Sequence, residues 1–347
     1  MKLMKKTFLM AVLSMVATMG FAQDWKKEPF MVKSLSGQNI QHVHAETSGG
    51  NLTVQSGSDS RVEVYVQPNN YKSVTGMSKS EIQARLDEYY DLDVSVSGQT
   101  LNAVAKPKKN MRDWNKSVSV SFVVYVSGNV STHLRTSGGN IGLFGLTGKQ
   151  DFTTSGGNLN LERLKGIIKG RTSGGNINLK DVSDNIDLTT SGGNITAENC
   201  NGTIELTTSG GSVNLTGLNG DIEATTSGGN VKGSGIRGSL GAHTSGGNVR
   251  MEDLRCAVDA STSGGNIDVE ITELTGTVRL TNSSGSIDLT IPNKGMDLDL
   301  RASKIKTGNL SNFSGNVEED EVRGKVNGGG PSVTARAGSG RISLSLK

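Results

Sequence analysis

Histidine side chains are the first residues in this sequence that could do chemistry. The chain has four, His42, His44, His133 and His243, and only His42 and His44 are close together in the sequence. Residues two apart on a β-strand point to the same face, so this pair could ligate a metal ion. Ordinary strand alternation is the simpler explanation of the pair, and we predict no metal site there.

A row of carboxylates is the second candidate. Asp187, Glu205 and Glu223 recur with an 18-residue period. If one such period forms one coil of a stack, these side chains lie about 4.8 Å apart and could hold a divalent cation. Lys169 and Gly241 interrupt the row, which favours a solvated charged face over a metal site.

Motifs of catalysis are missing from the sequence. It contains no P-loop, nucleophile elbow or metal-spaced Cys/His set. Enzymes that cleave polysaccharides on a β-helix need clustered carboxylates, or a carboxylate with Arg or Lys, in a groove framed by long loops. Coils as short as this period leave no room for such loops, and we expect no acid, base and nucleophile to converge in the repeats. We therefore predict a non-enzyme without catalytic residues, cofactor or metal.

The elements that carry these side chains are defined by a repeat. The motif Thr-Ser-Gly-Gly-Asn, with Ser replacing Asn once, recurs in eight copies at a strict 18-residue spacing. A fixed period indicates one structural unit that is copied and stacked. The first threonines of the copies, counted as position 1 of each coil, are Thr136, Thr154, Thr172, Thr190, Thr208, Thr226, Thr244 and Thr262.

The apolar pattern within one repeat predicts two strands. Position 6 is aliphatic in every copy, and positions 8, 15 and 17 are mostly apolar, with polar residues or Gly between them. Position 11 is an apolar corner and position 13 is usually Gly. Gly-Gly would supply positive φ or a close backbone approach, and the Asn after it tolerates left-handed geometry and bonds its own backbone. The fold class is thus all-β, a single-stranded parallel β-helix (β-solenoid) of 18-residue coils, and the spacing favours the right-handed form.

The sequence divides into four segments. Residues 1–22 form a predicted signal peptide that is cleaved after Ala22, which places the protein outside the cytoplasm, in the periplasm, on the surface or secreted. Residues 23–135 are expected to form an N-terminal cap and irregular first coils, with a capping helix near 78–90 that begins with a Ser78–Glu81 capping box. Residues 136–281 form the regular β-helix, and residues 282–347 its degraded C-terminal coils and cap, with worn turns at 308–310 and 338–342.

Charge, hydropathy and cysteine spacing argue against nucleic-acid binding, a membrane span and a disulfide. Three of the 36 basic residues lie in the leader, and the other 33 balance the 33 acidic residues, so no nucleic-acid footprint is present. No later segment is apolar enough to span a membrane. Cys200 and Cys256 lie three coils apart, about 14 Å, which is too far for a disulfide.

The iterated Thr-Ser-Gly-Gly-Asn motif behind a leader resembles the bacterial envelope family called "putative adhesins", a domain of unknown function. The resemblance covers residues 38–347, and the leader's ending, Phe21-Ala22-Gln23, resembles those of the Bacteroidetes. It implies an exported right-handed β-helix and supplies no catalytic residue.

We expect a non-catalytic, exported cell-envelope solenoid with adhesin-like binding or scaffolding, whose partner is unknown and could be a glycan or a surface protein. The alternative is a carbohydrate-active protein, either a glycan binder or a polysaccharide-cleaving β-helix enzyme. Binding is expected in the N-terminal part, where Tyr71, Trp114 and Tyr125 are available.

Overall fold

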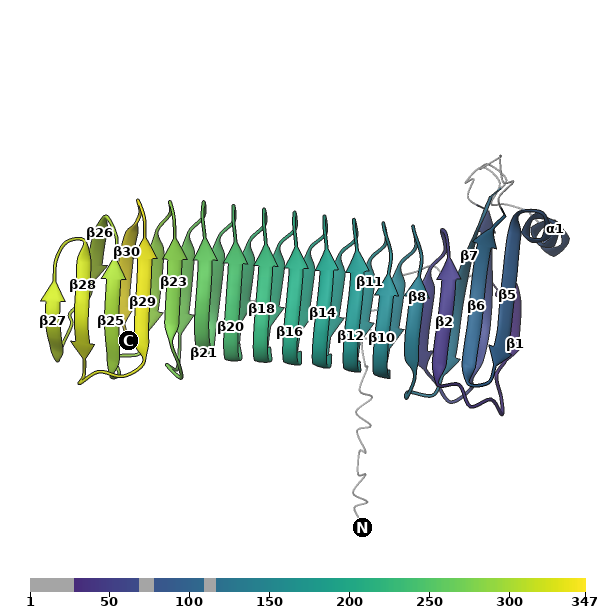
Figure 1. Ribbon diagram of the computed structural model, residues 1–347, viewed down its shortest axis with the longest axis horizontal. Helices are drawn as coiled ribbons and strands as arrows, with labels where there is room; N and C mark the ends of the chain where they lie inside the picture. The colour runs from purple at the N-terminus through teal and green to yellow at the C-terminus, as the bar shows by residue number, and fades with distance from the viewer. Residues whose placement is uncertain (1–27, 69–77, 109–116) are drawn as a thin grey trace, which may run out of the picture.

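The computed structural model describes residues 28–68, 78–108 and 117–347. They form a long rod in which two sheets face each other and the strands run across the rod axis (Figure 1). The predicted all-β solenoid is confirmed, and its handedness stays a prediction. The predicted signal peptide lies outside the described residues.

One sheet, called sheet A here, carries the strands that follow each Thr-Ser-Gly-Gly-Asn turn. Its strands are β1 (Met31–Ser34), β3 (Leu52–Ser56), β4 (Arg61–Pro68), β7 (Val118–Val126), β9 (Ile141–Phe144), β11 (Leu159–Glu162), β13 (Ile177–Lys180), β15 (Ile195–Glu198), β17 (Val213–Thr216), β19 (Val231–Ser234), the first part of β21 (Val249–Thr262), β22 (Ile267–Ile271), β24 (Ile287–Ile291), β26 (Lys304–Thr307) and β30 (Arg341–Leu346).

The opposite sheet, sheet B, carries the strands that lead into those turns. Its strands are β2 (His42–Thr47), β5 (Tyr90–Ser97), β6 (Thr100–Pro107), β8 (Ser131–Arg135), β10 (Thr147–Thr153), β12 (Lys165–Thr172), β14 (Ser183–Thr190), β16 (Asn201–Thr208), β18 (Asn219–Thr226), β20 (Arg237–Thr244), the second part of β21, β23 (Val278–Asn282), β25 (Met296–Arg301), β27 (Phe313–Val317), β28 (Glu321–Val326) and β29 (Ser332–Ala337).

Successive coils pair in parallel and in register. Ile177 pairs with Ile195, which pairs with Val213, and all three side chains are fully buried. The predicted inward column at position 6 is therefore confirmed. Because each strand is held by an equivalent strand on either side, the aliphatic columns form one continuous core between the sheets.

The Gly-Gly pair is required for a close backbone approach. A Cβ on Gly193 would lie 2.0 Å from the carbonyl oxygen of Gly175 in the preceding coil, whereas a Cβ on Gly192 would meet nothing nearer than 3.6 Å. Neither glycine has a positive φ. Of the two roles expected for the pair, close approach is therefore the correct one, and it falls on the second glycine.

The Thr and Asn of the motif join one coil to the next. The Thr190 hydroxyl donates to the carbonyl oxygen of Gly175 (2.8 Å) and accepts from the Gly193 N–H (3.3 Å). The Asn194 N–H donates to Oδ1 of Asn176 (2.8 Å). The expectation that this Asn adopts left-handed geometry and bonds its own backbone is wrong, because its oxygen instead satisfies an N–H of the following coil.

Left-handed geometry occurs at position 10 in seven of the eight coils rather than at the Asn of the motif. The φ angles there lie between 50° and 67°. The position is mostly Gly, Asn or Asp, the residues that adopt this conformation most readily, so its composition was a usable signal. The seven left-handed residues at this position are Gly145, Arg163, Asp181, Asn199, Gly217, Gly235 and Asp253, and the eighth coil has Ile271 without a positive φ.

At the N-terminal end the order in space differs from the order in sequence. The coil made by β2 and β3 lies between the later strands β6 and β7 on one side and β8 and β9 on the other. Beyond it, β5 pairs antiparallel with β6, and β4 pairs antiparallel with both β7 and β1. The irregular first coils expected here are thus one early coil inserted under later strands.

The predicted helix is confirmed as α1 (Lys79–Tyr89), with the expected capping box between Ser78 and Glu81. It lies beyond β5 at the extreme end of the rod (Figure 1). Its buried residues are Leu86 and Tyr89, and the hydroxyl of the next residue, Tyr90, donates to the Val118 carbonyl (2.6 Å).

The C-terminal end is arranged in the same way. Strands β29 and β30 lie between the coil of β23 and β24 and the coil of β25 and β26 (Figure 1). The hairpin-like pair β27 and β28 closes sheet B by antiparallel pairing with β25. Residues 338–342 carry a true worn turn, since a Cβ on Gly340 would lie 2.0 Å from the Gly285 oxygen. Residues 308–310 do not, because they follow β26 and lead into β27.

Candidate functional site

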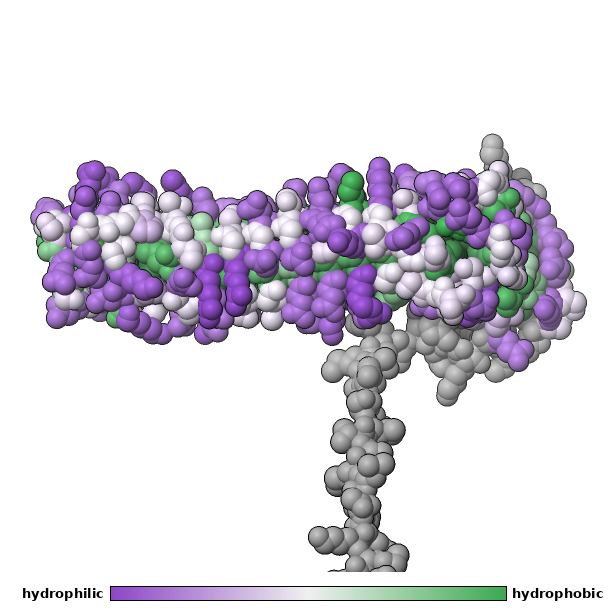
Figure 2. Space-filling model, turned by 90° about the horizontal axis from the view of Figure 1, so that it is seen from below, coloured by the Kyte–Doolittle hydropathy of each residue, from purple (hydrophilic) through white to green (hydrophobic). Residues whose placement is uncertain are grey.

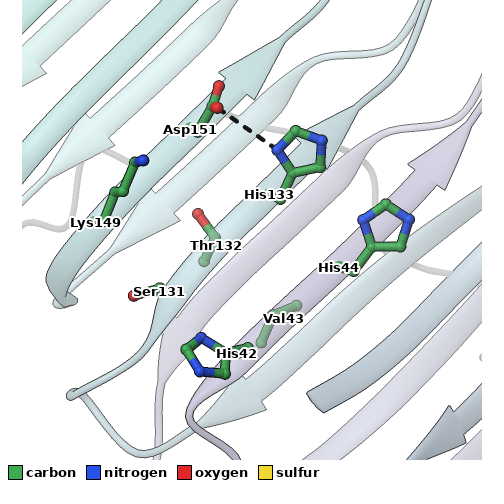
Figure 3. A pocket seen from close by; sticks show the side chains of 8 residues that line it. All are labelled: His42, Val43, His44, Ser131, Thr132, His133, Lys149 and Asp151. Carbon is green, nitrogen blue, oxygen red and sulfur yellow. Dashed lines mark ion pairs between the residues drawn. The ribbon is translucent and has the colours of Figure 1, made fainter.

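A shallow depression on sheet B brings three neighbouring strands together near the N-terminal end. Figure 3 shows His42 and His44 on β2, Ser131 and His133 on β8, and Lys149 and Asp151 on β10. Strand alternation turns these side chains outward, while Val43 and Thr132 between them are buried. The sequence neighbours His42 and His44 are therefore joined by a third histidine from a strand much later in the chain.

The two central imidazoles stack. His44 and His133 are register partners, and their rings lie 5.5 Å apart, centroid to centroid, at an interplanar angle of 11°. Nδ1 of His133 lies 3.6 Å from Oδ2 of Asp151, and Nε2 of His133 accepts from Nε of Arg135 (2.9 Å). These partners place the proton of neutral His133 on Nδ1. Its Nε2 lone pair is thereby occupied and not free for a metal ion.

Electrostatics favour the neutral form of His44. Burial lowers the pKa of His44 below 6.5, and the positive charge of protonated His133 lowers it further, while Glu46 acts in the opposite direction. Glu46 itself is paired with Lys106 at 3.0 Å. In the ranges that the structure describes, no three His, Cys, Asp or Glu side chains are placed to share a metal ion. The depression therefore offers hydrogen-bond donors and acceptors rather than a metal cage.

The acidic row is present, and the carboxylate at each of its ends has a side-chain partner. Asp187, Glu205 and Glu223 are register partners on β14, β16 and β18. Lys169 pairs with Asp187 at 2.9 Å, and His243 lies 3.4 Å from Glu223. At the Asp187 end, Lys169, which interrupts the row, supplies the counter-charge. At the Glu223 end, the partner is His243, two residues after Gly241, which interrupts the row.

One constellation contradicts the sequence analysis, which expected no acid, base and nucleophile to converge in the repeats. Nδ1 of His243 lies 2.8 Å from Oγ of Ser261, and Nε2 of the same ring lies 3.4 Å from Oε1 of Glu223. The 18-residue register alone places Ser261 beside His243. Glu223 is the diagonal neighbour, one coil and two positions earlier, so the pattern could have been found by scanning adjacent rows rather than single columns.

Of the three aromatic residues expected to bind a partner, the structure describes Tyr125 alone, and Tyr125 does not line the depression. Trp114 and Tyr71 lie outside the described residues, and Tyr125 belongs to β7 of sheet A. The guanidinium carbon of Arg61 lies 3.7 Å from the centroid of the Tyr125 ring and covers one of its faces. Nε of Arg61 donates to Glu63 (2.8 Å), which also accepts from the Tyr65 hydroxyl (2.9 Å). Burial raises the pKa of Tyr65 to about 12.

The two cysteines offer no reactive thiol. Cys200 and Cys256 are both free and buried. Burial raises the pKa of each thiol to about 11. Both thiols are therefore protonated at neutral pH, and the thiolate is the reactive species.

Hydrophilic side chains cover most of the surface seen in Figure 2, and the larger hydrophobic patches lie near the N-terminal end. Among the described residues, no helix has the length and apolar character needed to cross a bilayer.

Residues 180–345 match the family described as Toastrack DUF4097. The matched segment makes up slightly less than half of the chain. The resemblance to an adhesin-like domain of unknown function is confirmed over it. The matched segment contains Glu223, His243 and Ser261, whereas the depression around His44 and His133 lies before it. No curated protein sequence matches the chain.

Three solved structures are similar at low identity, each over 91% of this chain, with TM-scores of 0.22. A "putative cell adhesion protein" from Clostridium sporogenes is 10% identical over 98% of its own chain. A "putative adhesin" from Bacteroides fragilis and a "putative lipid binding protein" from Parabacteroides distasonis are each 14% identical over 96% of theirs. At this TM-score we draw no conclusion from them about fold or ligand.

Proposed function

We propose that this protein is a non-catalytic, exported cell-envelope solenoid that acts by adhesin-like binding or as an envelope scaffold. The observation that carries the proposal is the use of the repeat motif. Its Thr, second Gly and Asn are occupied in contacts between coils. The outward side chains form flat rows in register, a surface suited to an extended partner.

The depression around His44 and His133 is the proposed binding place. It joins imidazole, hydroxyl and ammonium groups on one face, and these are donors and acceptors that match sugar hydroxyls or polar groups of a surface protein. Tyr71 and Trp114 remain predicted contributors from the same part of the chain. Tyr125 is on the other sheet, so it would serve a separate contact.

The proposed envelope location depends on export, which is a prediction from the sequence. The proposal rests on the leader-like residues 1–22, and cleavage after Ala22 is checked by the N-terminal sequence of the protein recovered from its native host.

The binding test uses the mature chain, residues 23–347, on a glycan array and in a pull-down from bacterial envelope proteins. We expect a retained partner and at least a 10-fold weaker affinity for the double variant His44→Ala/Lys149→Ala. The matched control is Asn160→Ala/Asn178→Ala, which removes an amide pair (3.0 Å) from the outer face of sheet A. Equal binding by both variants would contradict the proposed place.

The same preparation tests the carbohydrate-active alternative. Plant, host and bacterial polysaccharides are incubated with the mature protein and calcium, and reducing ends are measured. No release above a heat-killed control is expected, because Asp187 and Glu223 of the carboxylate row are each paired with a cationic residue or a histidine. Released product would contradict the non-enzyme assignment.

A further inference from the structure

Three adjacent strands of sheet B, β18, β20 and β21, carry a second chemical site far along the rod from the depression (Figure 1). Thr225, His243 and Ser261 are register partners in one outward row. In the next outward row, Glu223 is the register partner of Gly241. Here the Glu223 side chain reaches from its own row to His243 in the neighbouring row.

Glu223 reaches His243 because Gly241 has no side chain. A Cβ on Gly241 would lie 1.9 Å from Oε2 of Glu223. The carboxylate therefore occupies the space that any other residue at this position would fill. The Thr225 hydroxyl donates to Oε1 of Glu223 (3.2 Å) and holds it in place. The gap in the acidic row is thus the feature that turns Glu223 toward the imidazole.

The contacts of His243 determine which of its ring nitrogens carries the proton. A carboxylate accepts only, so Nε2 carries the hydrogen toward Glu223, and Nδ1 presents its lone pair to Ser261 at 2.8 Å. The Ser261 hydroxyl therefore donates to a base that is itself oriented by an acid. This sequence of acid, base and hydroxyl is the arrangement that activates a serine nucleophile. The His243 side chain is 32% exposed, so a reagent in solution has access to the site.

We propose that Ser261 is a nucleophile that takes an acyl group from an activated ester, with His243 as its general base and Glu223 as a positioning residue. In this step the Ser261 O–H bond breaks and its proton moves to Nδ1 of His243. Oγ forms a bond to the acyl carbon, and the bond to the leaving oxygen breaks with its electron pair. The proton then passes from His243 to water, which leaves an ester on Ser261 and a free alkoxide or phenolate.

The site favours a single modification over repeated turnover. The strands around Ser261 are paired on both sides, by β20 and by β23. Their backbone N–H groups are used in the parallel ladder and do not form an oxyanion hole. Hydrolysis of the acyl-serine lacks that stabilisation, so the ester is expected to persist.

The test is labelling of the mature chain with p-nitrophenyl acetate, followed by intact mass and peptide mapping. We expect one acetyl group on Ser261, formed faster than on Ser209, an exposed serine in the turn of an earlier coil. Ser261→Ala removes the label. His243→Thr installs the residue found at this position in earlier coils, such as Thr207, and keeps the fold. The His243→Thr substitution should slow labelling of Ser261 at least ~10-fold. A positioned general base in an enclosed active site contributes ~10²–10⁴-fold to the rate.

Glu223 is tested by a charge series. Glu223→Gln should slow acetylation without moving the thermal midpoint, and Glu223→Asp, which keeps the charge, should retain more of the rate than Gln. Acetyl groups confined to lysines, or an unchanged Ser261 rate in His243→Thr, would overturn the proposal. The glycan and envelope binding test involves other residues, so Ser261→Ala should leave it unchanged, and the two proposals fail independently.

Discussion

At the scale of single residues, the repeat motif acts through hydrogen bonds whose chemistry matters more than residue identity. Asn282 stands where the eight regular coils have Thr. Its Nδ2 donates to the Gly265 carbonyl (2.8 Å), and its Oδ1 accepts from the Gly285 N–H (2.8 Å). A primary amide thus makes both bonds of the Thr hydroxyl. The worn turn of the last coil has Ala337 at this point and makes neither side-chain bond, so these two bonds belong to the regular coils and to the coil of Asn282.

The two glycines of the motif should differ sharply in tolerance. Gly193→Ala places a methyl group 2.0 Å from a backbone oxygen that cannot move without shifting the neighbouring coil. It should lower the free energy of unfolding by about 3 kcal/mol, the upper end of the usual cost of overpacking. Gly192→Ala has ordinary contacts and should change it by no more than about 0.5 kcal/mol. Chemical denaturation compares the two, and equal losses would contradict the close-approach role.

The buried thiols predict slow alkylation. With pKa values of about 11, Cys200 and Cys256 present almost no thiolate at pH 8 and little surface to a reagent. Iodoacetamide should leave the native, unreduced protein unmodified within minutes and add two groups after denaturation in guanidinium. A native protein that yields fewer than two groups after denaturation without reductant would indicate a disulfide and a wrong coil count.

The imidazole of His44 predicts a loss of stability in acid. Its pKa in the folded protein lies below 6.5, so the unfolded chain takes up the proton first as the pH falls. The contribution of neutral His44 to the free energy of unfolding is therefore fully present above about pH 6.5. It is lost as the pH falls from there toward the lowered pKa of His44 in the folded protein. The thermal midpoint should fall less between pH 7.5 and 5 in His44→Gln than in the wild type. Ser131→Ala, in the same depression, should keep the wild-type dependence.

At the scale of elements, coils are matched to their neighbours rather than identical. At position 17 the Phe152 ring extends over Gly170, where a Cβ would lie 2.1 Å from a ring carbon. Leu188 follows in the next coil. The Phe152 ring fills space that a side chain at position 170 would otherwise occupy, which keeps the core closely packed.

This compensation predicts a rescue. Gly170→Ala alone should lower the free energy of unfolding by about 1–3 kcal/mol because it overpacks the core against Phe152. Adding Phe152→Leu shortens the neighbour and should recover most of that loss, although the double variant gives up some buried area. The measurement is a double-mutant cycle by denaturant unfolding. Strictly additive losses would show that the two positions do not share one space.

At the scale of the whole molecule, both ends of the rod place strands out of sequence order. An early coil is inserted at one end and the last coil at the other. Outside them lie antiparallel strands, with α1 at the N-terminal end. Open sheet edges invite pairing with another chain, and a change of strand direction together with a covering helix interrupts the parallel pattern that a second rod would extend.

The inserted last coil predicts the result of a short truncation. Removing residues 332–347 deletes β29 and β30, which join β25 and β26 to the rest of the rod. Residues 296–331 should then exchange their amide hydrogens rapidly, whereas β22 to β24 should stay protected through their pairing with earlier coils. Hydrogen exchange with mass spectrometry reads both regions. Protection retained in 296–331 would mean that these strands fold on their own.

Much of the regular stack was predictable. Strict 18-residue spacing defined the coil, apolar alternation identified inward residues such as Ile195, and Ser78 with Glu81 marked the helix start. These features depend on neighbours along the chain or exactly one period away. The left-handed position 10 was readable from its Gly, Asn and Asp content but needed that column to be examined.

The sequence by itself determined the solenoid, because each coil repeats the same local geometry and the same inward columns. Only the tertiary structure decided which coils adjoin at the two ends, since strand insertion joins segments whose spacing follows no period. It also decided the contact of Glu223 with His243 and Ser261. That contact depends on the empty space over Gly241, which is a property of packing between rows and is invisible in any single column of the repeat.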